Sequence, residues 1–456
     1  MIANRDIEGR WWLLGKPDAV QYGILHFDPD EGLVLETKEA RAQSEAEIFE
    51  GLTEAGNEND GGTIIGRDRH DQPVTLFFCA RCGDESSAGL RVMRFHAGYA
   101  LMGREVPSWQ DVRLNSIRMD FTGLNSWLGF HPFNRKCEDG VAYVGYRYPD
   151  DFVFPVQEGV ELRIVAEGSI RDGAKDDNSL TLSEKRLFEL RWSAAADMKQ
   201  VHQWTLLLQR FLSLAMGKPV YVRSLRGFMD DRDHQHISTP IVLLKKNSGA
   251  VTAEELVLPG ETLFSFEDVK EHFGEIFNRW LEYTTRLDAV IDLYFAVVFN
   301  QSLYIDHRFL LLAQALERYH VVQIGGSRES PKEFDKRLRE ASSLLGEEHF
   351  TFFYEKLKWA NEKTLFQRLN ELLETRRGLS ADVIHEFPDF AKVVKNTRNY
   401  STHWDPSLEK KAAKGAHLVR LVDCMRLLLA NLFLTDLGLP TTAMSHALKS
   451  RFVEYE

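Results

Sequence analysis

The spacing of the apolar residues changes once along the chain, and this change limits the fold more than any other feature of the sequence. Before about residue 258 the apolar residues form short runs rich in β-branched and aromatic side chains, such as Gly32–Glu36 and Val74–Phe78. From Phe266–Phe299 onward they recur every three or four residues. Short runs between turn formers predict strands, whereas the wider spacing predicts helices. The sequence therefore predicts a multidomain α+β protein, with a β-rich, sandwich or barrel-like part at residues 1–262 and an all-α bundle at residues 263–456 that begins with a connector helix.

Individual helices can be placed from their spacing and from the residues at their ends. One helix is expected inside the β-rich part, at Met198–Met216. In the bundle, Pro331 and Gly438 are residue types that commonly start and end helices. Beyond Phe299 the expected helices cover Ser302–Gln323, Pro331–Leu345, Glu347–Glu374, Ala381–Asn399 and Ala412–Leu437.

The composition is that of an ordinary soluble globular protein, and 456 residues are enough for two or three domains. The formal net charge of -12 argues against a general nucleic-acid coat protein but allows an enzyme with a local basic patch. Four cysteines are too few for a disulfide framework, which points to a reducing compartment. The start lacks the apolar run of a signal peptide, and the apolar stretch Leu427–Leu434 is too short to span a bilayer. We therefore expect a cytoplasmic protein with no membrane partner.

One segment of the helical part, Arg398-Asn399-Tyr-Ser-Thr-His403, carries residues suited to chemistry on RNA. Cleavage of RNA without a metal needs a base for the 2′-hydroxyl, an acid for the leaving 5′-oxygen and a cation for the charge on the phosphate. A histidine suits the first two roles because its ordinary pKa lies near neutrality. An arginine suits the third because it stays charged and grips phosphate with a planar fork.

The spacing of these residues constrains how a site could form. On an ideal helix Arg398 and His403 lie roughly 140° apart, whereas Asn399 and His403 share a face. The arginine and the histidine converge only if the helix ends between them or if two copies of the chain face each other. Pro406 favours a helix end nearby. We therefore expect the site at a helix end and at a homodimer seam.

Basic residues flank this segment in an otherwise acidic chain. They could form a phosphate-attracting patch, and we take four of them, Lys395, Lys410, Lys411 and Lys414, as candidate RNA-binding residues. The simpler interpretation is that such lysines are solvated helix faces.

The arginine–histidine spacing is weak evidence by itself, because it is expected by chance about once in two chains of this length. A second instance occurs at Arg91 and His96. That pair lies in an alternating, strand-like run, lacks the asparagine, and would point to opposite sides of a strand. We therefore interpret it as unrelated to catalysis.

The segment Arg398-Asn399-x-x-x-His403 resembles the Arg-polar-x(3–5)-His signature of the HEPN superfamily, in its Apea-like branch. The following Trp404-Asp405-Pro406 and the upstream helix Phe309–Glu317 are similar to that branch as well. The first half resembles the ApeA N-terminal β-rich domain in four runs, at Gly9-Arg-Trp-Trp12, Gly23-Ile-Leu-His-Phe27, Gly32-Leu-Val-Leu35 and Val74-Thr-Leu76.

This resemblance implies an abortive-infection nuclease of bacterial anti-phage defence. It implies a homodimeric, metal-independent endoribonuclease that leaves a 2′,3′-cyclic phosphate, with no cofactor. The N-terminal domain would sense a phage-derived trigger and restrain the nuclease, and tRNA is one candidate RNA substrate. Arg398, Asn399 and His403 carry over as catalytic residues, and Glu317 carries over as a supporting, orienting residue. The alternative is a non-catalytic dimeric regulatory protein whose β-rich part binds a protein, a sugar or a nucleotide.

Two weaker patterns could bind metals. Cys79-Ala-Arg-Cys82 resembles half of a zinc site, which Cys137, His96 or His131 would have to complete. A thiol at the end of an apolar strand is more simply a small buried hydrophobe. The acidic and histidine-rich run Asp230–His236 is more simply a polar loop between strands. We therefore expect no metal site.

Overall fold

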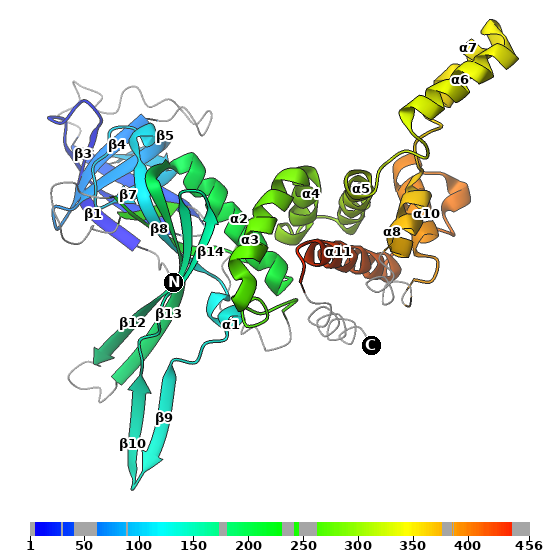
Figure 1. Ribbon diagram of the computed structural model, residues 1–456. Helices are drawn as coiled ribbons and strands as arrows, with labels where there is room; N and C mark the ends of the chain where they lie inside the picture. The colour runs from blue at the N-terminus through cyan, green and yellow to red at the C-terminus, as the bar shows by residue number, and fades with distance from the viewer. Residues whose placement is uncertain are drawn as a thin grey trace. The chain divides into compact units, whose positions relative to one another are not determined.

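The computed structural model describes residues 5–28, 31–40, 62–87, 90–172, 180–229, 241–245, 262–375, 385 and 387–439 of the chain. The chain divides into two compact units, residues 1–278 and 279–456. The first is rich in strands and the second is helical, which confirms the predicted fold class (Figure 1). The division falls inside helix α3 (Phe273–Arg286), because Phe273 and Phe277 at its start pack against Phe211 of the β-rich unit. The division expected from the sequence, after residue 262, precedes this helix.

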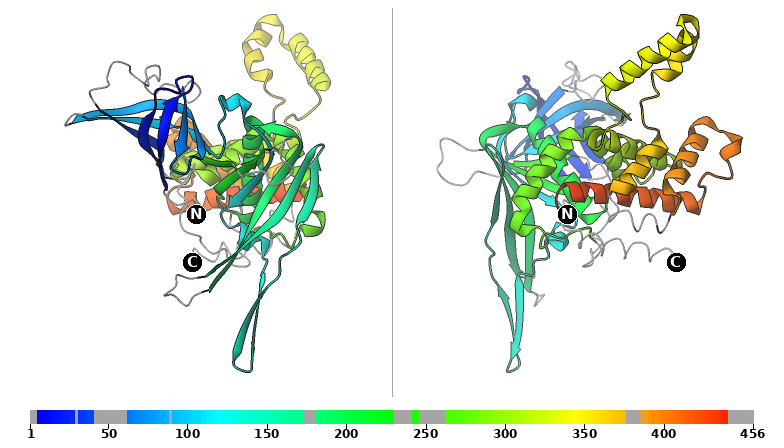
Figure 2. Two further views of the ribbon diagram at one scale, coloured as in Figure 1. Left: turned by 90° about the vertical axis from the view of Figure 1, so that its left-hand side faces the viewer. Right: turned by 45° about the vertical axis from the view of Figure 1, so that its right-hand side comes forward.

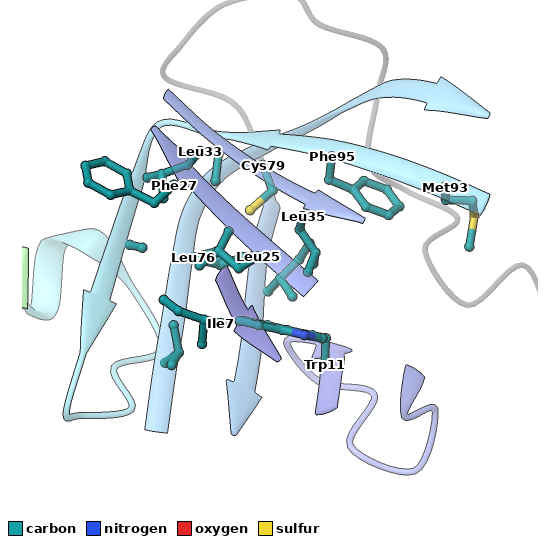
Figure 3. Close-up of a cluster of buried hydrophobic side chains, with 14 residues drawn as sticks. Ile7, Trp11, Leu25, Phe27, Leu33, Leu35, Leu76, Cys79, Met93 and Phe95 are labelled. Atoms are coloured by element: carbon teal, nitrogen blue, oxygen red, sulfur yellow. The ribbon is translucent and has the colours of Figure 1, made fainter. Parts of the chain in front are cut away.

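Six antiparallel strands of the β-rich unit form a closed barrel. Their ring order is β5-β4-β1-β2-β3-β6, and β6 pairs with β5 again to close it. Their bounds are β1 (Arg5–Leu13), β2 (Gln21–Asp28), β3 (Gly32–Ala40), β4 (Gly62–Asp68), β5 (Pro73–Ser87) and β6 (Leu90–Ala97). The alternating apolar residues point inward, so Trp11, Leu25, Leu76 and their neighbours fill the interior (Figure 3). Gly66 lies against the Trp11 ring, where any side chain would collide with it.

The sheet continues beyond the barrel from the other edge of β5. The strand order there is β7-β15-β14-β8-β13-β12-β11, again antiparallel. The bounds are β7 (Tyr99–Met102), β8 (Arg113–Phe121), β11 (Phe152–Gln157), β12 (Val160–Asp172), β13 (Leu180–Asp197), β14 (Val222–Phe228) and β15 (Ile241–Lys245). A separate hairpin pairs β9 (Phe133–Glu138) with β10 (Val141–Tyr146). Two short segments, η2 (Trp109–Asp111) and α1 (Leu124–Leu128), connect strands.

Helix α2 (Met198–Met216) packs against β8 and β13 and has the predicted bounds. It begins at a capping box, in which Asp197 and Gln200 exchange side-chain and backbone hydrogen bonds, and it ends at Gly217 in the left-handed conformation. Its buried face joins an aromatic core around Trp127 and Phe211.

The second unit consists of helices, among which the long, mostly buried α11 (Ala416–Asp436) packs against α5. At its end, the Asp436 carboxylate accepts hydrogen bonds from Tyr283 and Tyr319 at 3.0 and 2.6 Å. The remaining elements are η3 (Lys270–His272) before α3, α4 (Asp288–Phe299), α5 (Ile305–Gln323), α6 (Pro331–Leu345), α7 (Glu347–Leu357), α8 (Leu365–Thr375), α10 (Phe390–His403) and η4 (Pro406–Leu408). Helices α6 and α7 lie side by side as a hairpin (Figures 1 and 2).

Several predicted helices differ from the structure. The helical run Phe266–Phe299 is divided into α3 and α4, and α5 and α11 begin three and four residues later than expected. The run expected as one helix over Glu347–Glu374 is broken into α7 and α8, because the chain turns between Lys358 and Thr364. The helix expected to stop at Asn399 continues to His403. Across the described ranges, no helix combines the length and the hydropathy needed to cross a membrane.

Candidate functional site

Helix α10 carries the candidate catalytic residues at its C-terminal end. Its inner side buries Phe390, Val394 and Thr397, and the helix packs against α5 and α8. The helix ends at His403 because Trp404 adopts the left-handed conformation, with φ 51° and ψ 36°. The Trp404 backbone N–H then closes the last turn by donating to the Tyr400 carbonyl at 2.8 Å. The predicted helix end near the motif is therefore confirmed.

The three motif residues differ in exposure. Arg398 and Asn399 are half-buried, and His403 is exposed. The Arg398 guanidinium donates from Nη1 to Asn399 Oδ1 at 3.4 Å, and the Thr402 hydroxyl donates to the Arg398 carbonyl at 2.7 Å. Among the residues that the structure describes, Arg398 has no carboxylate partner and the His403 ring has no hydrogen bond. Both groups are therefore available to an incoming anion.

The helix runs unbroken through Arg398 and His403, so it does not end between them. The two residues are separated by about 7.5 Å along the axis and roughly 140° around it. Around that arc, Lys395 and Asn399 fall between them, and the buried Val394 and Thr397 fall outside it. Four of the predicted site residues thus occupy one strip of the helix surface. Of the two arrangements expected to bring arginine and histidine together, the structure excludes a helix end between them.

Glu317 lies on α5 and is engaged elsewhere. Its Oε1 accepts a hydrogen bond from Nη1 of Arg368 on α8 at 2.6 Å, and Arg368 is only 7% exposed. Within the described part of the chain, Glu317 forms no hydrogen bond or ion pair with Arg398, Asn399 or His403. This ion pair joins α5 to α8, and the supporting role expected for Glu317 stays a prediction. Sequence reasoning missed Arg368, and its position at helical spacing among leucines offered no signal.

A second polar cluster joins the same two helices one turn further along. The ring Nε2 of the buried His320 lies 2.8 Å from a carboxylate oxygen of Glu371, which also accepts a hydrogen bond from Lys363 at 2.6 Å. Burial lowers the pKa of His320. The hydrogen bonds from Lys363 and His320 lower the pKa of Glu371. We interpret this cluster as structural, because the imidazole is fully covered.

The candidate RNA-binding lysines fall into two groups. Lys395 on α10 and Lys410 and Lys411 after η4 are exposed. Lys414 is engaged: its ammonium lies 4.5 Å from the centre of the Tyr400 ring and donates to the Tyr400 hydroxyl and to Glu409. These two hydrogen bonds raise the pKa of Lys414.

The segment after the motif is fastened to α10. The Ala413 backbone N–H donates to the Thr397 hydroxyl at 2.9 Å. The Asp405 carboxylate accepts a hydrogen bond from the Ser407 N–H at 2.9 Å, and this bonding lowers the pKa of Asp405. The loop that carries Lys410 and Lys411 therefore has a defined position beside the motif.

The other Arg-x4-His pair lies on strand β6, as predicted from its alternating pattern. Arg91 donates to the Asp84 carboxylate from Nη2 at 2.7 Å and from Nε at 3.1 Å. These hydrogen bonds lower the pKa of Asp84. This arginine is therefore held in an ion pair within the sheet.

The cysteine pair is divided between the barrel interior and the solvent. Cys79 is 1% exposed in the barrel core, and burial raises the pKa of its thiol to about 12 (Figure 3). Cys82 is exposed. No group of three or more His, Cys, Asp or Glu side chains suited to a metal ion is found in the described part of the chain. The run Asp230–His236 lies outside the described residues.

Two family models match the chain. The model of ApeA N-terminal domain 1 matches residues 6–280, which is more than half of the chain. The model of the Apea-like HEPN domain matches residues 310–443 and contains the whole of α10. No curated protein and no solved structure matches the chain.

Proposed function

Because the chain belongs to the ApeA family and carries an Apea-like HEPN domain, the domain of a nuclease family of anti-phage defence, we propose that it is an endoribonuclease with Arg398, Asn399 and His403 as its catalytic residues. The observation that carries the proposal is the position of these residues. They lie at the exposed end of α10, inside the region that the HEPN model matches, and within the described residues neither the guanidinium nor the imidazole forms a hydrogen bond or an ion pair with a carboxylate, although the charge of His403 acts on Asp405.

The proposed reaction needs no metal. The 2′-oxygen of a ribose attacks the adjacent phosphorus, the bond to the 5′-oxygen breaks, and a 2′,3′-cyclic phosphate and a 5′-hydroxyl remain. One imidazole takes the proton of the 2′-hydroxyl, and a protonated imidazole gives a proton to the 5′-oxygen. Arg398 stabilises the negative charge that grows on the phosphate, and Asn399 positions the phosphate or the imidazole.

A second copy of the chain completes this site in our proposal. The base and the acid act in the same step, but each motif supplies one histidine. A two-fold interface would bring the same strip of α10 from two copies face to face. It would supply a second imidazole and would place the Arg398 of one copy near the His403 of the other, which the continuous helix prevents within one copy.

The remaining parts have proposed roles that follow from the family. The β-rich part, residues 1–262 in the division drawn from the sequence, would sense a phage-derived trigger and restrain the nuclease of residues 263–456. Lys395, Lys410 and Lys411 would attract the RNA backbone through their exposed charges. RNA is the proposed substrate, and tRNA is one candidate.

The test compares two histidines with the same sequence spacing from an arginine. The full chain and its His403→Ala and His96→Ala variants are expressed in bacteria, cells are challenged with phage, and RNA ends that carry a 2′,3′-cyclic phosphate are sequenced. We expect such ends with the wild type and with His96→Ala, and a loss of about 10²- to 10⁴-fold with His403→Ala. Equal cleavage by all three proteins would refute the assignment.

A chelator separates this chemistry from that of a metal nuclease. Cleavage by the purified protein, supplied with an extract of phage-infected cells, should continue unchanged in EDTA. Loss of cleavage in EDTA, restored by added Mg²⁺, would contradict the proposed reaction.

A further inference from the structure

Trp404, the residue that follows the motif, has an unusual combination of backbone conformation and exposure. Its side chain is 73% exposed, and its backbone φ of 51° lies in the left-handed region. Glycine and asparagine adopt that region far more readily than a bulky residue, and a glycine would end α10 equally well. Exposing an indole to water is also unfavourable. Strained, exposed residues of this kind tend to occur at functional sites.

Neighbouring groups hold this indole in place. The Tyr400 ring lies one helical turn back, with its centre 5.8 Å from that of Trp404 and a tilt of 55°. The Lys414 ammonium lies over the Tyr400 ring, and Glu409 holds Lys414 from the other side. Asp405, the next residue, caps η4, so the backbone on both sides of Trp404 has a defined conformation. Because the backbone is fixed and the Tyr400 ring lies beside the indole, the exposed ring needs little further ordering to bind a flat partner.

The charges around the ring suit a nucleic acid. Lys410 and Lys411 are exposed in the same short loop, and the charge of Lys411 acts on Asp405. His403 precedes the indole directly, so a base held on Trp404 would lie within about one nucleotide of a phosphate at the motif. Exposed aromatic rings beside cations are the usual means of holding unpaired bases.

We propose that Trp404, supported by Tyr400, is a stacking site for an unpaired nucleobase next to the phosphodiester that is cleaved. This inference rests on the proposed ribonuclease function and adds a requirement to it. A base within a duplex cannot lie on the ring without leaving its stack, so the site selects single-stranded loops and ends.

The test measures kcat/KM on a single-stranded oligoribonucleotide and on copies of it that lack one base at each position beside the cut. Alanine substitution of a stacking residue typically lowers binding by about five- to a hundredfold per base. We expect Trp404→Ala to lower kcat/KM within this range, and Trp404→Phe to retain most of it. Removing the stacked base should slow the wild type by a similar factor and leave Trp404→Ala unaffected.

Trp359 provides a matched control. It is 61% exposed and has a lysine, Lys358, over its ring, whereas the lysine near Trp404, Lys414, lies over the neighbouring Tyr400 ring. Trp359→Ala should therefore cleave both substrates like the wild type. If Trp404→Ala lost activity equally on the complete and the base-lacking substrates, or became monomeric where the wild type is dimeric, the indole would have a structural role and the inference would be wrong.

Failure of this inference differs from failure of the ribonuclease proposal. If the wild type cleaves RNA and Trp404→Ala cleaves equally well, only the stacking site is refuted. If neither protein nor any control cleaves RNA when triggered, the proposed function itself fails.

Discussion

The same spacing of arginine and histidine occurs twice in this molecule, once on strand β6 and once on helix α10. On the strand, Arg91 and His96 are about 16 Å apart along the chain direction and point to opposite faces. On the helix, Arg398 and His403 are about 7.5 Å apart along the axis and lie at the two edges of one continuous strip of the helix surface. Arg91 is held by Asp84, whereas Arg398 has no carboxylate partner among the described residues. The same arginine–histidine spacing can therefore serve catalysis only if the backbone brings both side chains to one surface and no carboxylate already holds the arginine.

The largest expected difference between the two regions is in RNA cleavage. Arg398→Ala should lower the rate of cleavage by at least about a thousandfold, because the charge that develops on the phosphate loses its cation. Arg91→Ala should leave the rate unchanged. Both rates can be measured on the triggered protein with a labelled oligoribonucleotide. Similar losses of cleavage from both variants would show that Arg398 has no catalytic role that Arg91 lacks.

The next difference is in stability, and two tryptophans measure it. Trp11 is fully buried in the barrel and Trp404 is 73% exposed. Trp11→Ala should lower the free energy of unfolding of the β-rich unit by about 3–5 kcal/mol, because it leaves a large cavity. Trp404→Ala should change the stability of the helical unit by less than about 0.5 kcal/mol. Urea unfolding followed by circular dichroism checks both, and a large loss from Trp404→Ala would place that ring in a packed core.

A smaller difference is expected between Cys79 and Cys82 in how each affects the pH dependence of the free energy of unfolding. The folded protein keeps the Cys79 proton up to a pKa of about 12, whereas the unfolded thiol loses it near its ordinary value of 9.0. Between these values the unfolded state binds fewer protons than the folded state. The contribution of Cys79 to the free energy of unfolding is therefore complete below pH 9 and falls as the pH rises, by up to about 1.4 kcal/mol per pH unit. In urea unfolding at pH 8.5 and pH 10.5, Cys79→Ala should remove this slope and Cys82→Ala should keep it. A wild-type slope equal to that of Cys79→Ala would contradict the burial of the thiol.

The smallest expected effect separates the lysines around α10. Lys410→Ala should weaken RNA binding several-fold and lower the slope of log affinity against log salt by about 0.7, as expected for one lost phosphate contact. Lys414→Ala should change that slope less, since the Lys414 charge already engages Tyr400 and Glu409. Binding isotherms of His403→Ala protein at several salt concentrations measure both slopes. A larger change for Lys414 would show that RNA displaces these partners.

Local signals in the sequence predicted the elements whose ends are determined locally. Helices α2 and α6 have the predicted bounds because each starts at a capping residue, Asp197 or Ser330, and stops at a glycine. Strand β1 was not predicted as a strand. Its Gly9-Arg-Trp-Trp run does not alternate clearly, and its conformation depends on pairing with β2 and β4.

Long-range partners could not be predicted in the same way. Within the barrel, β3 pairs with β6, whose paired residues are fifty or more positions apart, and the partner of Glu317 is Arg368 on a different helix. The residues of the candidate site could be chosen from the sequence because their chemistry is specific. Pro406 indicated a helix end near the motif, but the stop at His403, the exposure of the site residues and the engagement of Lys414 depend on packing, which the sequence pattern does not contain.

One mixed dimer tests directly whether Arg398 of one copy acts with His403 of another. Arg398→Ala and His403→Ala chains are co-expressed with different tags, and the dimer that carries both tags is purified and assayed with an extract of phage-infected cells. Each parent dimer should be nearly inactive. The mixed dimer retains one intact pair across the seam but only one of the two imidazoles, so we predict a rate above that of either parent and well below half of the wild-type rate. A mixed dimer as inactive as its parents would contradict the account.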